Sequence, residues 1–249
     1  MSGIDRPLQI LAVMPGGMEG IEETGCIGRA VEDHGSKLHW IYRLRGDRFP
    51  QALHGFDGLI VFGGEIGAHE VEHADYFAEL YRLIRSFHAA DKPILGSCLG
   101  AQSIACAFGG ASMPQGFYEF GFAELHSEPQ ATGDALLDGF ASPLPLFVMH
   151  HDTFVLPDKA VRLLRGDRIE NQVFRIGRKT YGFQPHFEAT SEIVELWAGR
   201  ELANSGEYSP TALAEKMATI EQEYERFGRQ QSIFGATIMN RWLALFDER

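Results

Sequence analysis

Short apolar runs alternate with amphipathic segments over the first half of the chain. Apolar residues dominate positions 8–15, 38–44, 56–62 and 93–97, and each run has the length of a buried strand. Before the last run, apolar residues recur at helical spacing over roughly 72–90, and a further helix is expected after the first run. This alternation predicts an α/β fold with an open, mostly parallel, twisted sheet and helices on both faces.

The pattern changes after the first half of the chain. Polar and apolar residues alternate in 120–126 and in parts of 145–150, which indicates strands that are less buried or antiparallel. The stretch 173–183 is typical of a hairpin, with its turn at 177–179. We therefore expect a small antiparallel sheet in addition to the parallel one.

The last part of the chain has helical periodicity. Apolar stripes cover 211–227 and 234–245, and Gly228 between them predicts a break into two helices. We expect one domain over residues 1–190 and a helical extension over 191–249 that packs on the same domain. A face that binds a partner is the alternative role for these helices.

Composition restricts the classes of function. The 249 residues are enough for one large domain, with 45% hydrophobic and 22% charged residues, as in ordinary soluble proteins. The net charge of −12 and the absence of a Lys/Arg run argue against nucleic acid as a partner. No 18-residue apolar run predicts a membrane helix, and residues 1–7 lack a signal-peptide pattern.

Three cysteines, at positions 26, 98 and 106, form no pair with metal-ligand spacing. Their odd number predicts free thiols in a reducing cytoplasm. Cys98 differs from the others because it lies in a Gly-x-Cys-x-Gly sequence between an apolar strand and an alanine-rich helix. That pattern is typical of a nucleophile elbow, in which the helix dipole favours the thiolate. A buried structural cysteine beside two loop glycines is the alternative.

A cysteine nucleophile needs a base, and the base needs a group that orients it. His186 and Glu188 are two residues apart near the end of a predicted strand, so their side chains point to the same side. One carboxylate could then bind one ring nitrogen and leave the other for the sulfur. A surface histidine and glutamate at a strand end are the alternative interpretation.

Two glycine-rich turns follow predicted strands. Gly63-Gly64 lies where a backbone N–H could stabilise an oxyanion together with the N–H of Leu99, and a simple tight turn is equally compatible. The turn that starts at Gly16-Gly17 lacks the full G-x-G-x-x-G spacing, which argues against a nucleotide cofactor.

Four segments resemble the class I (triad) glutamine amidotransferases, in the order of that family and over roughly residues 8–190. The elbow 96–102 is similar to the family's G-x-C-x-G-x-Q motif, and 57–64 to its oxyanion strand and Gly-Gly turn. Residues 182–188 resemble the G-V-Q-F-H-P-E motif, and 148–157 resemble a His-Gly-Asp segment of members related to the glutaminase domain of GMP synthase.

The resemblance implies a flavodoxin-like class I amidotransferase fold and a catalytic triad of Cys98, His186 and Glu188. It implies that Cys98 attacks the side-chain amide of glutamine or of a γ-glutamyl compound and forms a γ-glutamyl thioester. The backbone N–H groups of Gly64 and Leu99 would form the oxyanion hole, and Gln102 would help to hold the substrate. No metal and no cofactor are implied.

The chain also departs from the family pattern. Pro185 precedes the histidine and Phe187 follows it, His151 stands where glycine is common, and the stretch 65–70 has no counterpart that we can match. No phosphate-binding G-x-x-x-x-G-K-[ST] motif is present, so a synthetase that uses the ammonia would be a separate polypeptide. The alternatives are a γ-glutamyl peptidase or γ-glutamyl-amine hydrolase and a catalytically silent regulatory subunit.

Overall fold

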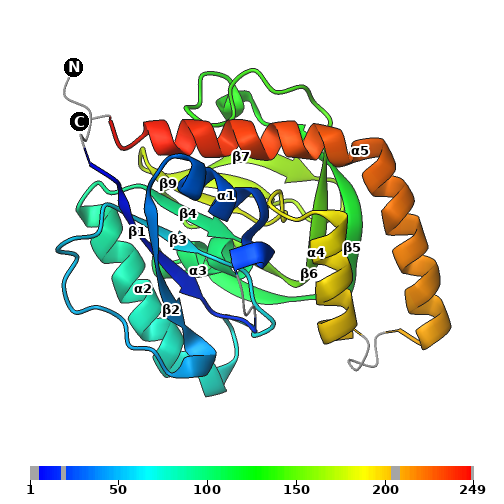
Figure 1. Ribbon diagram of the computed structural model, residues 1–249, viewed down its shortest axis with the longest axis horizontal. Coiled ribbons are helices and arrows are strands. Elements are labelled where there is room, and N and C mark those ends of the chain that lie inside the picture. Colours follow the sequence, from blue (N-terminus) through cyan, green and yellow to red (C-terminus); the bar gives the residue numbers. More distant parts are fainter. Residues whose placement is uncertain (1–5, 18–20, 203–207, 248–249) are drawn as a thin grey trace.

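The computed structural model describes residues 6–17, 21–202 and 208–247. Residues 1–5 and Gly20, on which two of the interpretations above depend in part, lie outside these ranges. In the described part of the chain, nine strands form a single sheet (Figure 1). In order across the sheet, they are β2 (Lys37–Tyr42), β1 (Gln9–Met14), β3 (Gly58–Val61), β4 (Ile94–Ser97), β9 (Thr180–Phe183), β8 (Val173–Ile176), β7 (Ala160–Gly166), β5 (Ala111–Ser127) and β6 (Leu144–Val155).

One half of the sheet is parallel. Strands β2, β1, β3, β4 and β9 pair in parallel, in the strand order of a flavodoxin-like doubly wound sheet. The order along the chain reverses between β1 and β3, and ligands of such folds bind at the carboxyl ends of the strands at this point. The prediction of an α/β fold with this sheet is confirmed.

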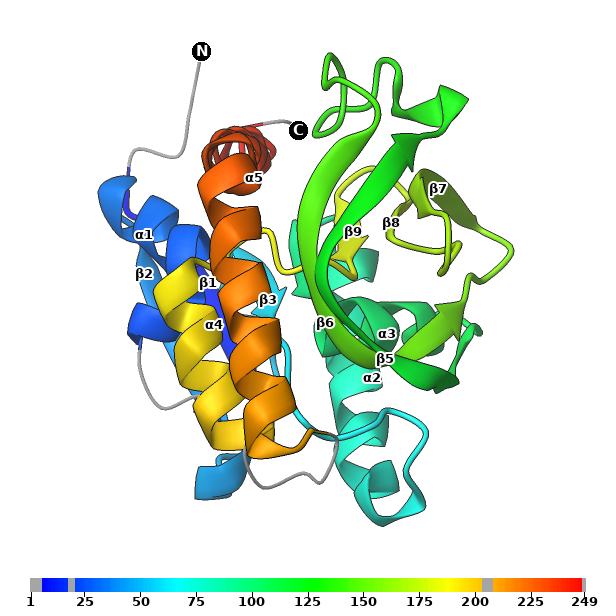
Figure 2. The same cartoon turned by 90° about the vertical axis from the view of Figure 1, so that its right-hand side faces the viewer.

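The other half is antiparallel and continues the same sheet. The predicted hairpin is present as β8 and β9, and β9 pairs with β4 on its other side. The antiparallel strands β7, β5 and β6 are therefore joined to the parallel strands and do not form a small sheet of their own. Figure 2 shows β5 and β6 as a long, strongly curved ribbon at one end of the molecule. The sheet is larger and more mixed than the sequence pattern indicated.

Helices cover both faces of the sheet. They are α1 (Gly25–Asp33), α2 (Ala74–Ala89), α3 (Leu99–Ala107), α4 (Ser191–Trp197) and α5 (Pro210–Ala244), with short 3-10 or π turns at Ile21–Thr24, Arg43–Arg45, Val71–His73, Pro129–Ala131 and Ala198–Leu202. Residues of β1 alternate between two apolar cores: Ile10 and Ala12 contribute to the core beneath α1 and α5, and Leu11 to the core beneath α2 and α3. Burial of both faces explains why the parallel strands are continuous apolar runs.

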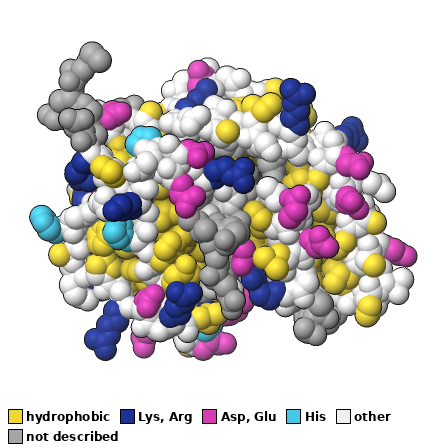
Figure 3. Space-filling view, in the orientation of Figure 1, with side chains coloured by type: hydrophobic (Ala, Val, Ile, Leu, Met, Phe, Trp, Pro, Cys, Tyr) yellow, Lys and Arg dark blue, Asp and Glu magenta, His cyan; other side chains and the backbone are white. Residues whose placement is uncertain are grey.

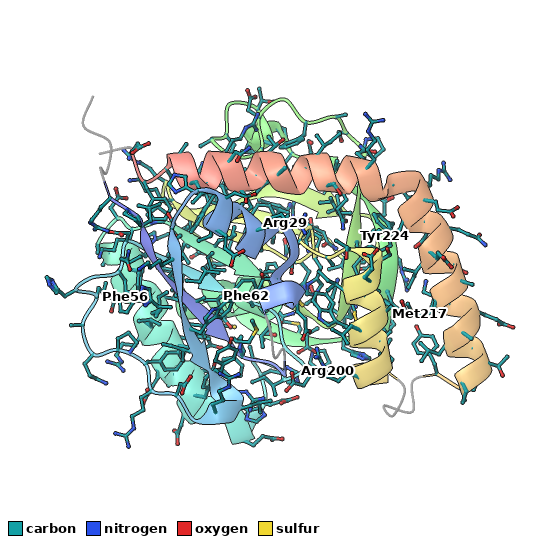
Figure 4. All side chains as sticks on the ribbon, viewed as in Figure 1. Arg29, Phe56, Phe62, Arg200, Met217 and Tyr224 are labelled. Atoms are coloured by element: carbon teal, nitrogen blue, oxygen red, sulfur yellow. The ribbon has the colours of Figure 1, made fainter. Side chains whose placement is uncertain are left out.

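The predicted break at Gly228 is wrong. Helix α5 runs without interruption for 35 residues, although Figure 1 shows that it bends sharply in its middle. A glycine costs a helix only about 1 kcal/mol relative to alanine. The helix packs on β5 and β6 and on α1, and these contacts outweigh that cost. Tyr224 reaches from α5 toward β5, where its ring packs against Phe122 (Figure 4).

Within the described ranges, no helix combines the length and the apolar character needed to cross a lipid bilayer. Acidic and basic side chains are interspersed over the face of the molecule drawn in Figure 3.

Candidate functional site

Cys98 forms the sharp turn between β4 and α3. Its backbone has φ +50° and ψ −109°, a conformation that an ordinary side chain rarely adopts. The turn requires small neighbours: a Cβ atom at Gly100 would lie 2.0 Å from the carbonyl oxygen of Val61, and one at Gly96 would lie 2.6 Å from the backbone of Gly100. The local geometry is that of a nucleophile elbow, with the cysteine at the N-terminus of a helix.

His186 and Glu188 follow the last strand of the parallel half and are both buried. The ring Nδ1 of His186 lies 2.9 Å from Oε1 of Glu188, so the N–H donates to the carboxylate. The same oxygen accepts a hydrogen bond of 2.7 Å from the hydroxyl of Ser97, which immediately precedes the cysteine. These contacts fix the tautomer of His186 and leave Nε2 for Cys98.

The electrostatics of His186 follow from these neighbours. Burial of the ring acts to lower the pKa of His186, but Cys98 and Glu188 both raise it by charge and by hydrogen bonding. The net result is a pKa well above the ordinary value for histidine. An imidazolium at neutral pH is the form that stabilises a neighbouring thiolate and can donate a proton to a leaving group.

The other two cysteines have a different environment. Burial raises the pKa of Cys26 to about 12 and also raises the pKa of Cys106 above its ordinary value. Both are therefore protonated thiols at neutral pH. Neither sulfur has a described histidine as a hydrogen-bond partner. The structure thus singles out Cys98 as the candidate nucleophile.

Two backbone donors lie beside Cys98. Among the described residues, neither the N–H of Gly64 nor that of Leu99 donates a hydrogen bond, and both residues line a cavity together with Cys98. The turn at Gly64 is held by close contact with the turn after β1, because a Cβ at Gly64 would lie 2.7 Å from the nitrogen of Gly16. The two glycine-rich turns thus support each other at the point where the strand order reverses.

Cys98 separates two cavities. The narrow cavity has a volume of about 40 Å³ and is lined by Gly16, Gly17, Gly63, Gly64, Glu65, Cys98, Met149, His186 and Trp197. The wide cavity has a volume of about 300 Å³ and is lined by Gly64, Glu65, Ile66, Gly67, His69, Glu70, Cys98, Leu99, Gln102, Pro114, Tyr118, Met149, His150, His151 and Asp152. His186 lines only the narrow cavity, whereas Gln102 and the predicted specificity stretch 65–70 line the wide cavity.

Gln102 is buried and already has hydrogen-bond partners. Its side-chain NH2 lies 3.2 Å from Oε1 of Gln184 and 3.3 Å from the carbonyl oxygen of Asp152. The NH2 group of Gln184 in turn lies 3.5 Å from the sulfur of Cys98. Gln102 therefore contacts the site mainly through Gln184, and a direct contact with substrate stays a prediction.

Several residues of the site were not identified from the sequence. Ser97 and Gln184 lie inside motifs that were recognised, so their positions carried a usable signal. Trp197 packs its ring against His186, with centroids 4.9 Å apart, but a single tryptophan on a helix is usually part of the core. Gly16 was considered only for nucleotide binding, and its contact with Gly64 requires the tertiary structure.

One group of described side chains has the spacing of metal ligands. It consists of Glu70, Glu72 and His73, of which Glu72 is exposed and the other two are partly exposed. This is the character of a solvated surface cluster, and it supports no assignment.

Comparison with known proteins identifies relatives of the chain. It matches the family described as glutamine amidotransferase class-I over residues 33–195. It is 32% identical over 181 residues to the glutamine amidotransferase-like protein YfeJ of Salmonella typhimurium, which covers 71% of this chain and 75% of that protein. It is 30% identical over 193 residues to the glutamine-hydrolyzing GMP synthase of Porphyromonas gingivalis, over 75% of this chain and 36% of that enzyme. It is 35% identical over 136 residues to a separately encoded part of the glutamine-hydrolyzing GMP synthase of Methanosarcina mazei, over 54% of this chain and 65% of that protein.

The fold also has known counterparts. A glutamine amidotransferase from Thermotoga maritima superimposes with a TM-score of 0.79 at 22% identity, over 98% of this chain and all of that one. The family match ends at residue 195, and the predicted division into 1–190 and 191–249 stays a prediction.

Proposed function

The chain belongs to the class I glutamine amidotransferase family, and we propose that it is a cysteine-dependent hydrolase of the side-chain amide of glutamine. The observation that carries this proposal is the buried series of contacts that orients His186 beside the elbow cysteine. Glu188 accepts from both His186 and Ser97, and the neighbouring Cys98 raises the pKa of the ring. These residues supply a nucleophile, a proton donor and a group that orients the donor.

In the proposed first half-reaction, the thiolate of Cys98 attacks the amide carbon of glutamine. The oxyanion of the tetrahedral intermediate accepts hydrogen bonds from the N–H groups of Gly64 and Leu99. The C–N bond then breaks while the imidazolium of His186 donates its Nε2 proton to the departing nitrogen. The products are ammonia and a γ-glutamyl thioester on Cys98.

In the second half-reaction, neutral His186 removes a proton from a water molecule that attacks the thioester carbon. The tetrahedral intermediate collapses, the C–S bond breaks, and glutamate leaves with the Cys98 thiolate restored. Glu188 stabilises the imidazolium in both halves. These steps need no metal and no organic cofactor.

The wide cavity is the proposed place for the γ-glutamyl part of the substrate. Its walls carry polar and charged side chains, including His69 and Asp152, which lie 3.1 Å apart. Such groups suit the α-ammonium and α-carboxylate of glutamine. Gln102 at the same cavity is proposed to support this binding, partly through Gln184.

A separate synthetase subunit is the proposed recipient of the ammonia, in a cytoplasmic setting. Two observations support this: the similarity to a separately encoded part of a GMP synthase, and the length of the chain, which spans only 36% of the full GMP synthases. A γ-glutamyl peptide or γ-glutamyl amine would be cleaved by the same chemistry and is the alternative substrate.

The test compares glutamine with a panel of γ-glutamyl amides and peptides. We expect ammonia and glutamate from glutamine, and a loss of at least about 10³-fold in kcat for Cys98→Ala. Cys106→Ala is the matched control, because it removes another free thiol from the same helix and is expected to keep wild-type turnover. Both variants should retain the fold by circular dichroism.

Amine release from the panel with glutamine inert would replace the proposed substrate by the alternative. Near-wild-type turnover in folded Cys98→Ala would refute the mechanism. Failure of a glutamine-directed electrophile to label Cys98 in the folded protein would favour the silent regulatory role.

A further inference from the structure

Trp197 lies at the end of α4, beyond the motifs that define the site, yet it contacts His186. The two rings are in edge-to-face arrangement, with centroids 4.9 Å apart and an angle of 61° between their planes. The indole is almost fully buried, at 4% exposure, and it lines the narrow cavity together with Cys98 and His186. It is the largest side chain among the residues that line this cavity.

Polar contacts hold the indole in this place. Its Nε1–H donates a hydrogen bond of 2.8 Å to a carboxylate oxygen of Glu23, which is itself buried. Arg200, just after α4, binds both oxygens of the same carboxylate at 3.1 and 2.8 Å. Figure 4 shows Arg200 beside the end of α4. The charge-assisted pair fixes the carboxylate, and the carboxylate fixes the ring.

The position of His186 determines where the leaving nitrogen must lie. The nitrogen that departs from the thioester-forming step takes its proton from His186, so it has to be within hydrogen-bond reach of that ring. His186 lines the narrow cavity and not the wide one. The departing nitrogen therefore faces the narrow cavity, whose volume of about 40 Å³ is little more than the roughly 30 Å³ that a water molecule occupies in the liquid.

We infer that Trp197 is a specificity-determining residue that limits the leaving group to ammonia. The indole fills the space that a substituent on the departing nitrogen would need, and Glu23 and Arg200 keep it from moving aside. The substrate is then an unsubstituted γ-amide, and γ-glutamyl amines and peptides are excluded by size. This inference rests on the proposed function of Cys98 and His186.

The test measures one ratio, kcat/KM for γ-glutamylethylamide divided by kcat/KM for glutamine. The wild type should strongly favour glutamine, and Trp197→Ala should raise the ratio at least about tenfold, since one or two buried methylenes are worth that much in discrimination. Both substrates depend equally on His186, so any loss of its positioning cancels in the ratio. Leu196→Ala is the matched control, because Leu196 precedes the tryptophan on α4 but is 51% exposed.

An unchanged ratio in folded Trp197→Ala that still hydrolyses glutamine would overturn this inference alone. A wild type that prefers the ethylamide would also overturn it. A folded wild type that releases nitrogen from neither compound would overturn the proposed function, and this inference with it. If Trp197→Ala does not fold, Trp197→Phe assayed with γ-glutamylmethylamide replaces it, with a smaller rise in the same direction expected and no rise counting against the inference.

Discussion

The narrow and wide cavities meet at Cys98 and share Gly64, Glu65 and Met149, but their other walls come from different parts of the fold. The narrow cavity is built from turns at the carboxyl ends of parallel strands, from His186 and from α4. The wide cavity is built from stretch 65–70, α3 and the antiparallel strands β5 and β6.

The difference separates chemistry from binding. The parallel half places backbone N–H groups, the elbow and the histidine within a small buried volume, where electrostatic effects are strong. The antiparallel half and the 65–70 stretch supply charged side chains around a larger space. Changes on the narrow side should therefore affect kcat and the choice of leaving group, and changes on the wide side should affect KM.

The largest effect on the narrow side is expected for Glu188→Gln. The amide cannot stabilise the imidazolium, so kcat for glutamine should fall about 10³-fold with little change in KM. The pKa of His186 should also fall, because the Glu188 charge is one of the causes that raise it. Steady-state kinetics and an NMR titration of the ring measure the two results.

Glu195→Gln is the control for that variant, since Glu195 is exposed on α4. A loss that appeared in KM and left kcat intact would contradict the division between the two cavities.

A smaller effect is expected on the wide side for Asp152→Asn. Asp152 lies 3.1 Å from His69, and loss of its charge should raise KM for glutamine about tenfold while kcat stays within a few-fold. Asp158→Asn, at an exposed position after β6, should have no effect. If kcat fell and KM did not change, the wide cavity would take part in chemistry and the comparison would fail.

The smallest expected effect concerns stability and its dependence on pH. The pKa of His186 is raised in the folded protein, so its stabilising contribution is complete below the unfolded value of about 6.5 and is lost as the pH rises through the folded value. The difference in free energy of unfolding between wild type and His186→Gln should therefore shrink as the pH increases. Denaturant titrations at several pH values measure it, and a difference that grew with pH would contradict the sign.

Local patterns predicted most elements of the fold. The apolar run at 8–15 is strand β1, the stripe over 72–90 is α2, and 173–183 is a hairpin. These features depend on burial over a few neighbouring residues, which periodicity reports directly. Strand partners are not encoded in this way, so the pairing of β9 with β4, which joins both halves of the sheet, could not be predicted.

The failure at Gly228 has a similar cause. Helix propensity is a local quantity of about 1 kcal/mol, and the packing of α5 on strands and on α1 is a sum of many distant contacts. A break was predicted because only the first of these two quantities is visible in the sequence.

The sequence by itself determined the chemistry that this chain can offer. The small residues around Cys98, the spacing of His186 and Glu188, and the Gly63-Gly64 turn are local requirements of backbone geometry and hydrogen bonding, so they leave a readable pattern. Only the tertiary structure decided how that chemistry is enclosed. Trp197 and Glu23 are 174 residues apart in sequence and meet at the narrow cavity because chain packing, which no local pattern records, brings α4 against the turn before α1.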